Sequence, residues 1–280
     1  MNKIAVLTVV FPSIVPYLDD YKKSLLNQTI KEFDILFVND GLEESFLSEF
    51  FDGFQLKTLP PGKSRAKHRE IGIQYAKENG YEYLILCDAD DFFQEKRIED
   101  SIKYLDEKDA DIVVNNLDIV GETGNVVAKR YFSPRVSDKT VLNATFLYDK
   151  NIFGLSNTAL RLSTIPDVVL PEKLIIVDWF LFAYLLEKGM KAVFIDKSLT
   201  FYRQHEENSI GINRATIETF KKQSLFKADH FKHLADCFEK YTDLYKKSQE
   251  LMYLTDDEIN TIIVKSEKMK NPLWWEIINK

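Results

Sequence analysis

An apolar run that ends in three carboxylates constrains this chain more than any other feature. Within Tyr81–Phe93, which reads Y-E-Y-L-I-L-C-D-A-D-D-F-F, the run Tyr83–Cys87 stops at Asp88, Asp90 and Asp91. The run has the length and residue types of a strand that is buried on both faces. Open α/β sheets bind ligands beyond the carboxyl ends of their strands, so we expect a ligand site here. Because carboxylates this close repel one another, a divalent cation that also binds a diphosphate is the partner that fits best.

The same segment partly matches a calcium-binding loop. Asp88, Asp90 and Glu99 occupy the first, third and twelfth places of such a loop. Phe92, however, replaces an oxygen ligand, and Phe93 stands where the sharp turn requires glycine. We therefore reject a calcium loop.

Composition describes an ordinary globular protein and argues against one class of partner. Of the 280 residues, 45% are hydrophobic and 29% are charged, which suits one large domain or one domain with an appendage. The net charge of −7 lacks the basic excess typical of nucleic-acid binding. We therefore expect no nucleic-acid partner, and an anionic nucleotide substrate must be neutralised locally by a metal or a few arginines.

The cysteines and the amino terminus indicate a cytoplasmic protein. Cys87 and Cys237 lie far apart and lack the spacing of a metal site, and such sparse usage fits a reducing compartment. The apolar stretch Ile4–Val10 is too short to span a membrane and lacks a small-residue cleavage site. We interpret it as a first strand.

Apolar runs that alternate with helical spacings predict an α/β fold with a mixed, mainly parallel sheet flanked by helices. Strands are predicted at Ile4–Val10, Asp34–Val38, Gln55–Leu59, Tyr83–Cys87, Asp111–Val120, Val126–Phe132, Ala192–Ile195 and Leu199–Tyr202. Helices are predicted at about Val15–Gln28, Ser64–Glu78, Thr140–Tyr148 and Val177–Lys188. Ile98, Ile102 and Leu105 predict one more helix, and Asp91 as its cap is an alternative to a role in the site.

From about Gly211 the pattern changes to an amphipathic helical tail. Phe231, Leu234, Phe238 and Tyr241 recur at three- and four-residue spacing with charges between them. We therefore divide the chain into residues 1–211 and a carboxyl-terminal helical extension, residues 212–280. We expect the extension to pack on the first domain. The alternatives are a protein partner and peripheral contact with the inner face of a membrane.

Two pairs of residues in the extension are candidates for a functional role. Trp274 and Trp275 suit either a docking anchor or an interface patch. His230 and His233 share one helical face, but no carboxylate is placed to complete a zinc-binding helix. We interpret both histidines as surface residues.

Six short segments that carry polar residues near predicted strand ends and helix starts follow one another along residues 3–210. They are A-V-L-T-V-V-F-P-S from Ala5, V-N-D-G with Asp40, K-H-R-E-I-G with Arg69, L-C-D-A-D-D with Asp88 and Asp90, I-V-D-W-F-L with Asp178, and Y-R-Q-H-E-E-N with His205. Together they resemble family 2 glycosyltransferases, inverting enzymes of the GT-A fold that use nucleotide-sugar donors. The chain departs from the family pattern at Pro12, Asn39, Glu70 and Val177.

The resemblance implies a role for each matched residue. Asp178 is implied as the catalytic base, and Asp90 and His205 are implied as metal ligands. Donor contacts are implied for Val9, Phe11, Asp40, Arg69, Asp88, Ala89, Asp90 and His205. The implied cofactor is Mn²⁺ or Mg²⁺, and a UDP-sugar is the first donor to expect. The implied acceptor is a saccharide or a lipid-linked glycan of a bacterial surface polysaccharide or glycoconjugate.

Ordinary structural roles compete at three of these positions. Asp178 stands at a predicted helix start, where the dipole favours an ionised carboxylate and where a simple helix cap is the alternative. Arg69 either pairs with the diphosphate or covers the helix surface with its stem. His205 either reaches the metal or the diphosphate, or bonds within the closing strand. Residues 203–211 are expected to form a lid that orders over the donor and excludes water.

The predicted function is that of a metal-dependent inverting glycosyltransferase, and two other functions compete with it. A sugar-1-phosphate nucleotidyltransferase needs a glycine-rich, basic loop after the first strand, and Val10–Tyr17 contains neither glycine nor Lys or Arg. A catalytically inactive nucleotide- or carbohydrate-binding module does not need Asp88, Asp90 and Asp178 together.

Overall fold

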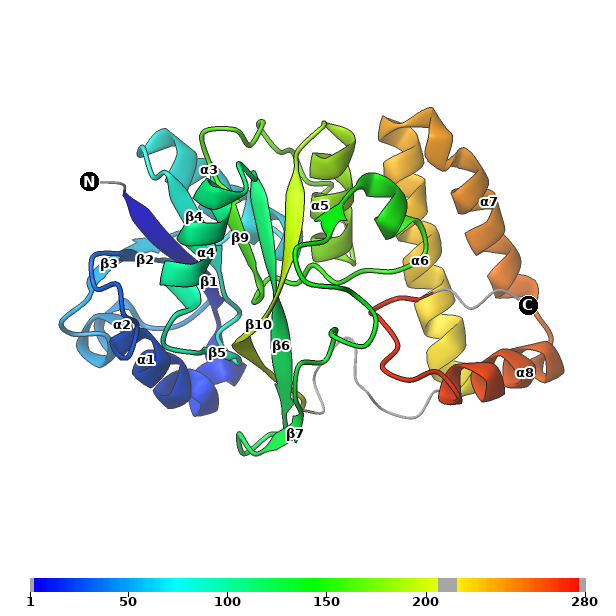
Figure 1. Ribbon diagram of the computed structural model, residues 1–280, viewed down its shortest axis with the longest axis horizontal. Helices are drawn as coiled ribbons and strands as arrows, with labels where there is room; N and C mark the ends of the chain where they lie inside the picture. Colours follow the sequence, from blue (N-terminus) through cyan, green and yellow to red (C-terminus); the bar gives the residue numbers. More distant parts are fainter. Residues whose placement is uncertain (1–2, 206–215, 277–280) are drawn as a thin grey trace.

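A computed structural model describes residues 3–205 and 216–276, which fold around one mixed β-sheet (Figure 1). The strand order is β3-β2-β1-β4-β9-β6-β10-β5, with β7 beside β6 and β8 beside β10. The strands are β1 (Ile4–Val10), β2 (Asp34–Asn39), β3 (Gln55–Leu59), β4 (Tyr83–Leu86), β5 (Phe92–Phe93), β6 (Ile112–Val120), β7 (Val126–Ala128), β8 (Val141–Leu142), β9 (Thr158–Arg161) and β10 (Ala192–Arg203). This arrangement confirms the predicted α/β fold with its mixed sheet.

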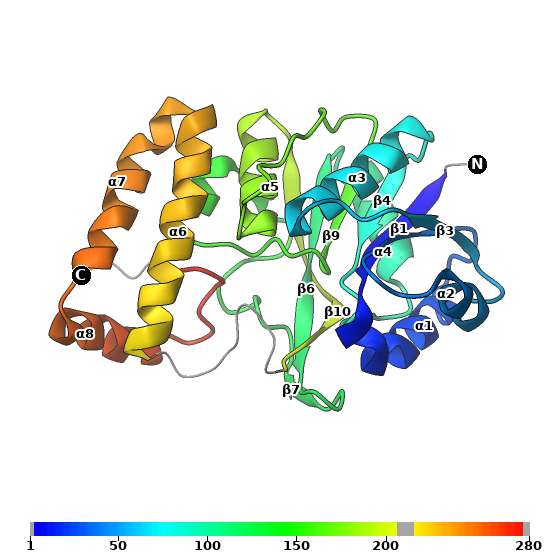
Figure 2. The same ribbon diagram turned by 180° about the vertical axis from the view of Figure 1, so that it is seen from behind.

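The amino-terminal half of the sheet is parallel, because β1 pairs with β2 and β4, and β2 pairs with β3, all in parallel register. Helices cover both faces: α3 (Arg65–Glu78) and α5 (Val177–Glu187) lie on one side, best seen in Figure 2, and α1 (Leu18–Leu26), α2 (Glu44–Phe50) and α4 (Arg97–Glu107) lie on the other. Leu7 and Val9 of β1 belong to the hydrophobic core on the side of α3 and α5, whereas Val6 and Val10 belong to the core on the side of α1, α2 and α4. Two buried faces explain why β1 is a continuous apolar run.

The second half of the sheet introduces antiparallel pairs. β9 runs antiparallel between β4 and β6, whereas β10 pairs with β6 in parallel. The two predicted closing strands are one long strand, β10, whose register is irregular between Ile195 and Thr200. The polar residues between the two apolar runs predicted a break in the strand, but a bulge accommodates them without ending it.

Other local predictions differ from the structure. The predicted first helix is a 3₁₀ turn, η1 (Pro12–Tyr17), followed by α1. The predicted helix at Thr140–Tyr148 is instead the edge strand β8 and a 3₁₀ turn, η2 (Ala144–Tyr148). Asn143 begins that turn by accepting a hydrogen bond from the backbone N–H of Phe146 at 3.1 Å. The predicted strand at Val126–Phe132 is shortened to β7.

The carboxyl-terminal extension consists of helices that stand beside α5 (Figure 1). They are α6 (Ile217–Cys237), η3 (Glu239–Tyr241), α7 (Thr242–Glu250), η4 (Leu251–Tyr253) and α8 (Asp256–Glu267). Phe231 of α6 meets the ring of Trp179 in α5 edge to face, with ring centroids 5.4 Å apart. The extension therefore packs on the first domain as expected, and the boundary at residue 211 stays a prediction. Among the helices of the described ranges, none is long and apolar enough to cross a bilayer.

The prediction that His230 lies at the surface is wrong. The residue is fully buried, and its ring stacks on Trp179 with centroids 4.0 Å apart. The amphipathic pattern gave the wrong burial for His230, because α6 packs against α5 on one side and also contacts Trp275 through Phe226. A helix covered on more than one side does not show a single apolar stripe.

Candidate active site

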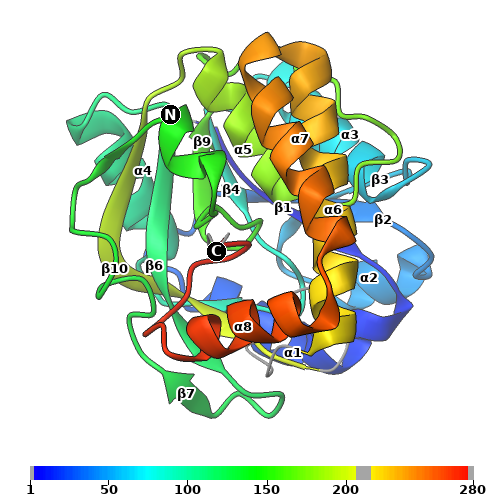
Figure 3. The same ribbon diagram turned by 90° about the vertical axis from the view of Figure 1, so that its right-hand side faces the viewer.

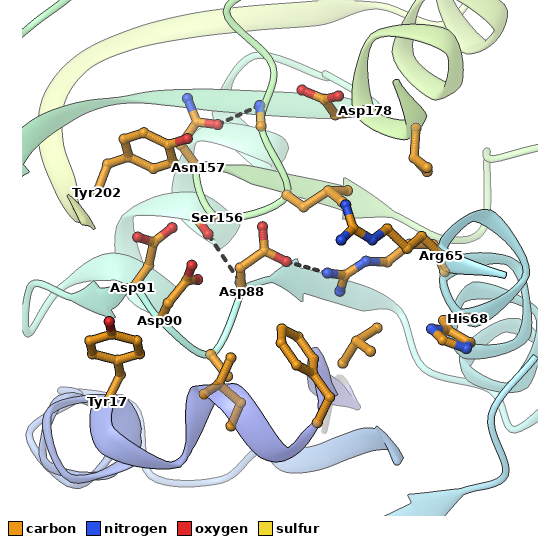
Figure 4. Close-up of a pocket in the computed structure, with 18 of the residues that line it drawn as sticks. Tyr17, Arg65, His68, Asp88, Asp90, Asp91, Ser156, Asn157, Asp178 and Tyr202 are labelled. Atoms are coloured by element: carbon orange, nitrogen blue, oxygen red, sulfur yellow. Dashed lines mark hydrogen bonds and ion pairs between the residues drawn. The ribbon is translucent and has the colours of Figure 1, made fainter. Parts of the chain in front are cut away.

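One cavity of about 660 Å³ lies at the carboxyl ends of β1, β2 and β4 and beside the start of α5. Its wall includes every residue that the sequence predicted as a site residue: Val9, Phe11, Asp40, Arg69, Asp88, Ala89, Asp90, Asp178 and His205. Figure 4 shows how several of these side chains converge from different elements. Parallel strands bring their carboxyl ends to one edge of the sheet, and Arg69 of α3 and Asp178 of α5 join the residues at that edge. The role of each residue stays a prediction.

The acidic loop after β4 supplies three carboxylates with different partners. Asp88 forms an ion pair with Arg69, and its backbone N–H donates to Ser156 Oγ at 3.0 Å. Asp90 Oδ2 lies 3.0 Å from His205 Nε2. Burial raises the pKa of the Asp88 carboxyl, and the Arg69 guanidinium opposes that rise.

Asp91 has a structural role that the sequence did not reveal. It is buried, and its Oδ1 accepts the backbone N–H of Arg203 at 2.7 Å, which joins the acidic loop to the end of β10. Burial, followed by the nearby Asp90 carboxylate, raises the pKa of Asp91 well above its usual value. The alternative in which Asp91 caps the next helix is wrong, because α4 begins at Arg97 after Lys96.

His205 is held over the cavity by the end of β10 and by an aromatic neighbour. Its ring stacks on Tyr17 of η1 with centroids 5.2 Å apart. Arg203 anchors this end of the strand, since Nε donates to the Asp90 carbonyl oxygen at 2.8 Å and an Nη donates to Asp20 at 2.7 Å. Arg203 is therefore a buried anchor and not the start of a mobile lid. The rest of the predicted lid, residues 206–211, lies outside the described residues.

The end of the cavity near β2 is shaped by the turn V-N-D-G. Asn39 fixes this turn, because its side chain donates to the Leu42 carbonyl oxygen at 2.7 Å and accepts the Leu42 N–H at 2.9 Å. Asp40 is thereby left facing the cavity, with Oδ2 3.9 Å from His68 Nε2 of α3. The departure from the family pattern at Asn39 thus has a structural use in the turn.

Asp178 lies in the first turn of α5, as predicted, but its protonation differs from the expectation. Burial raises its pKa from 3.8 to about 7, although the backbone N–H groups of Trp179 and of Asp178 itself oppose the rise. Asn151 Nδ2 donates to Asp178 Oδ2 at 3.0 Å and so fixes the direction of the carboxyl group. The helix start favours the ionised carboxylate, but it acts against a larger cost of removing the charge from water, so Asp178 holds its proton up to about pH 7.

Sequence reasoning missed several residues of the wall. Arg65, the first residue of α3, stands four residues before Arg69, so helical spacing was a usable signal. No carboxylate of the described ranges pairs with it. Ser156, Trp274 and Trp275 also line the cavity, although no sequence motif indicated that they belong to this site. The predicted docking anchor or interface patch is instead a buried wall of this site.

The donor set of the cavity fits a divalent cation that arrives with its ligand. Within residues 3–205 and 216–276, no three His, Cys, Asp or Glu side chains converge as a complete cage. Asp90 and His205 do form a close pair on the cavity wall. Mg²⁺ and similar ions are commonly bound by one or two carboxylates, with substrate phosphates and water completing the shell. The pair therefore suits an ion whose remaining ligands come from a diphosphate.

Comparison with known proteins places the chain in a family. The profile of glycosyl transferase family 2 matches residues 6–168, and the chain belongs to that family. Glycosyltransferase GlyG of Streptococcus pneumoniae is 32% identical over 107 residues, which are 36% of this chain and 34% of that protein. Poly(ribitol-phosphate) beta-N-acetylglucosaminyltransferase TarS of Staphylococcus aureus is 24% identical over 182 residues, which are 59% of this chain and 30% of TarS. The chain thus spans about a third of the length of these curated relatives.

Solved structures show the same fold. The crystal structure of TarS residues 1–349 in complex with UDP has a TM-score of 0.59 and 14% identity, and the match covers 95% of this chain and 91% of that one. GalNAc-T7 with UDP, GalNAc and Mn²⁺ has a TM-score of 0.57 and 14% identity, and the match covers 96% of this chain and 55% of that one. The sheet with its flanking helices is accordingly a GT-A fold.

Proposed function

We propose that this protein is a metal-dependent inverting glycosyltransferase that moves a sugar from a nucleotide-diphosphate donor to an acceptor hydroxyl. One observation carries the proposal. A single cavity joins Asp40 at one strand end, the Asp90–His205 pair at another, and Asp178 with its raised pKa at the start of α5. In this proposal Asp40 binds the nucleotide, the Asp90–His205 pair binds the metal ion that accompanies the diphosphate, and Asp178 is the base for the acceptor hydroxyl.

The donor is held by groups at the strand ends. Asp40 accepts hydrogen bonds from the nucleotide base, and Val9 and Phe11 line the same part of the wall. Arg65 and Arg69 place positive charge on α3 beside the acidic loop, where the diphosphate has to lie to reach Asp90 and His205. Because Arg69 already neutralises Asp88, the Asp88 carboxylate is free of a metal role and faces the donor sugar or ribose.

Asp90 and His205 would hold Mn²⁺ or Mg²⁺, which when bound supplies positive charge to the departing diphosphate. Asp178 takes the proton of the acceptor hydroxyl, and the acceptor oxygen forms a bond to the anomeric carbon from the face opposite the diphosphate. The bond from that carbon to the phosphate oxygen breaks, and its electron pair leaves with the diphosphate. A base with a pKa of about 7 accepts this proton efficiently near neutral pH.

The ligands named for related structures support a proposal for the donor and for the biological setting. TarS has been crystallised with UDP and with UDP-GlcNAc, and GalNAc-T7 with UDP, GalNAc and Mn²⁺. We infer that the donor is a UDP-sugar and that the acceptor is a glycan of a bacterial surface polysaccharide or glycoconjugate. The proposed location is the cytoplasm, with peripheral contact between the extension and the inner face of the membrane. Leu225, Tyr253 and Val264 are exposed apolar residues of the extension that support this contact.

A thermal-shift panel tests the donor assignment. The full chain is mixed with UDP-GlcNAc, UDP-GalNAc, UDP-glucose, UDP-galactose or GDP-mannose, each with Mn²⁺, Mg²⁺ or EDTA. A ligand at a hundred times its Kd adds about 2.7 kcal/mol, or roughly 5 °C in Tm for a chain of this size. We expect a metal-dependent shift with at least one UDP-sugar. Absence of any metal-dependent shift across the panel would contradict the proposal.

Product analysis separates the competing functions. A glycosyltransferase releases UDP from a UDP-sugar, slowly to water and faster to an acceptor. A sugar-1-phosphate nucleotidyltransferase releases pyrophosphate from UTP and a sugar 1-phosphate, and a binding module releases neither product. The loop at residues 10–17, which has no glycine and no Lys or Arg, favours the first outcome.

A further inference from the structure

The segment 271–276 follows the helices of the extension and runs back toward the sheet (Figure 3), where Trp274 and Trp275 line the cavity. The backbone N–H of Asn151 donates to the Trp274 carbonyl oxygen at 2.7 Å, and the Tyr131 hydroxyl donates to the Pro272 carbonyl oxygen at 2.9 Å. Arg135 pairs with Glu276 at 2.6 Å. Bonds on both sides of the two tryptophans fix them as part of the wall.

Trp275 has an unmet hydrogen-bond donor in this wall. The residue is 7% exposed, and its indole N–H finds no acceptor within the described ranges. Trp179, on whose ring Trp275 stacks with centroids 6.3 Å apart, instead donates its indole N–H to the Leu147 carbonyl oxygen at 2.8 Å. Buried indole N–H groups usually have a partner, because an unmet donor is costly. A ligand acceptor atom in the cavity would supply that partner.

The backbone at Trp275 is also strained. Its φ is +59°, a left-handed conformation that is a genuine outlier for a bulky side chain. Such conformations persist where the surrounding structure enforces them, and they cluster at ligand sites. The strain and the unmet N–H occur in one residue, and both point to a ligand.

Trp275 lies at the Asp178 end of the cavity. Asn151 links segment 271–276 to Asp178, since its backbone N–H donates to the Trp274 carbonyl oxygen and its side chain donates to Asp178. Trp179, the neighbour of Asp178 in the sequence, carries the stacked Trp275 ring. An acceptor hydroxyl has to lie next to Asp178, so the tryptophans border the space that the acceptor occupies.

The charge of this wall indicates the class of acceptor. The cationic side chains of the cavity are Arg65 and Arg69 on α3, with the histidines His68 and His205, and none belongs to segment 271–276. A wall of two indoles with one free N–H suits the apolar face and the hydroxyl oxygens of a sugar ring better than a phosphate group.

We propose that Trp275, supported by Trp274, binds a neutral saccharide ring of the acceptor, with the Trp275 indole N–H donating to a hydroxyl oxygen of that ring. This inference rests on the proposed glycosyltransferase function and extends it to the acceptor. Asn151 is a positioning residue that keeps the tryptophan wall and Asp178 in register.

Indole NMR tests the contact directly, because the chain has 3 tryptophans and therefore three indole N–H signals. Trp274→Phe and Trp275→Phe assign them. Methyl β-glucoside, methyl β-galactoside and methyl β-N-acetylglucosaminide are then titrated into the full chain with UDP and Mn²⁺ present, and glycerol 3-phosphate is the comparator. We expect a saturable shift of the Trp275 signal with at least one glycoside while Trp179 stays in place. Three results would overturn the inference: the Trp275 signal does not shift with any glycoside, it shifts only with glycerol 3-phosphate, or it shifts together with the Trp179 signal.

Kinetics with two variants separate hydrogen bonding from packing. Trp275→Phe keeps an aromatic ring but removes the donor, so the KM for the glycoside acceptor should rise roughly tenfold while the KM for the UDP-sugar keeps its value. Phe226→Leu loosens the contact with the same indole, whose centroid lies 6.4 Å away, but leaves the N–H in place. Equal rises of the acceptor KM in both variants would show a packing role and refute the proposal. Absence of turnover with every donor would contradict the proposed function. Normal turnover without any shift of the Trp275 indole signal would contradict only this inference.

Discussion

Replacing the carboxylate of Asp178 with an amide is expected to remove sugar transfer and to stabilise the fold at neutral pH. Burial raises the pKa of Asp178 from 3.8 to about 7 in the folded protein. Between these pH values the folded protein keeps a proton that the unfolded chain has released, so stability falls as pH rises through the window. Above about pH 7 the whole penalty is present, and Asp178→Asn removes it.

The size of the effect follows from the pKa and the hydrogen bonds. At 1.36 kcal/mol for each pH unit, the rise from 3.8 to about 7 corresponds to about 4 kcal/mol. The amide has a single acceptor oxygen for the N–H groups of Trp179 and Asn151, and each weakened bond costs about 1 kcal/mol. The expected net gain is therefore about 2 kcal/mol at pH 8, and it disappears toward pH 4.

Urea unfolding of Asp178→Asn and the unchanged protein at pH 4, 6 and 8 measures this difference, and UDP release with an acceptor measures transfer. Transfer by the unchanged protein should rise about tenfold for each pH unit up to about pH 7 and then level off. Donor binding should survive in the variant. A variant that is less stable at pH 8, or that transfers sugar at a near-normal rate, would refute the reasoning.

Three further changes probe other parts of the protein. Asp90→Asn should remove the metal-dependent part of donor affinity in calorimetric titrations, and equal UDP-sugar affinity in Mn²⁺ would contradict the ligand assignment. Asp40→Ala should weaken UDP binding by roughly tenfold both with Mn²⁺ and with EDTA, since a charge-assisted hydrogen bond is lost; an unchanged Kd speaks against the role. Burial holds the pKa of His230 well below 6.5, so the free energy of unfolding should decrease as pH falls below 6.5, where the unfolded chain binds a proton that the folded protein does not. His230→Phe should lack that component in urea unfolding at pH 5.5 and 7.5, and identical slopes for the two proteins would exclude it.

The strands were predictable where burial on two faces produces an unbroken apolar run. β1 and β3 lie where the runs indicated, and β2 and β4 differ only at their last residue. The sequence did not reveal α2, a short helix whose start has no side-chain cap, or β9, four residues without an apolar run. Asp40, Asp88 and Asp90 were predictable for a related reason, because they follow β2 and β4, and parallel strands bring their carboxyl ends to one edge.

Contacts made by residues remote in sequence were not predictable. Ser156 meets the Asp88 N–H across 68 positions, and Asn151 meets Asp178 across 27. Neither residue belongs to a motif, and each acts through a loop whose path depends on the whole fold. The same limitation hid the tryptophan wall, since the position of Trp274 and Trp275 depends on how the preceding extension packs on α5.

The acidic residues of the cavity differ in what compensates their charge, and this difference separates their roles. Asp88 has the Arg69 guanidinium, and Asp91 has the backbone N–H of Arg203. Asp178 accepts N–H hydrogen bonds but has no ion-pair partner among the described residues, and burial raises its pKa to about 7. Because an uncompensated carboxylate holds its proton to a higher pH, Asp178 is the group whose pKa is matched to proton transfer near neutrality. The free energy lost by leaving it uncompensated is the same quantity that the amide variant recovers, so the stability gain of Asp178→Asn and its loss of transfer have a single physical origin.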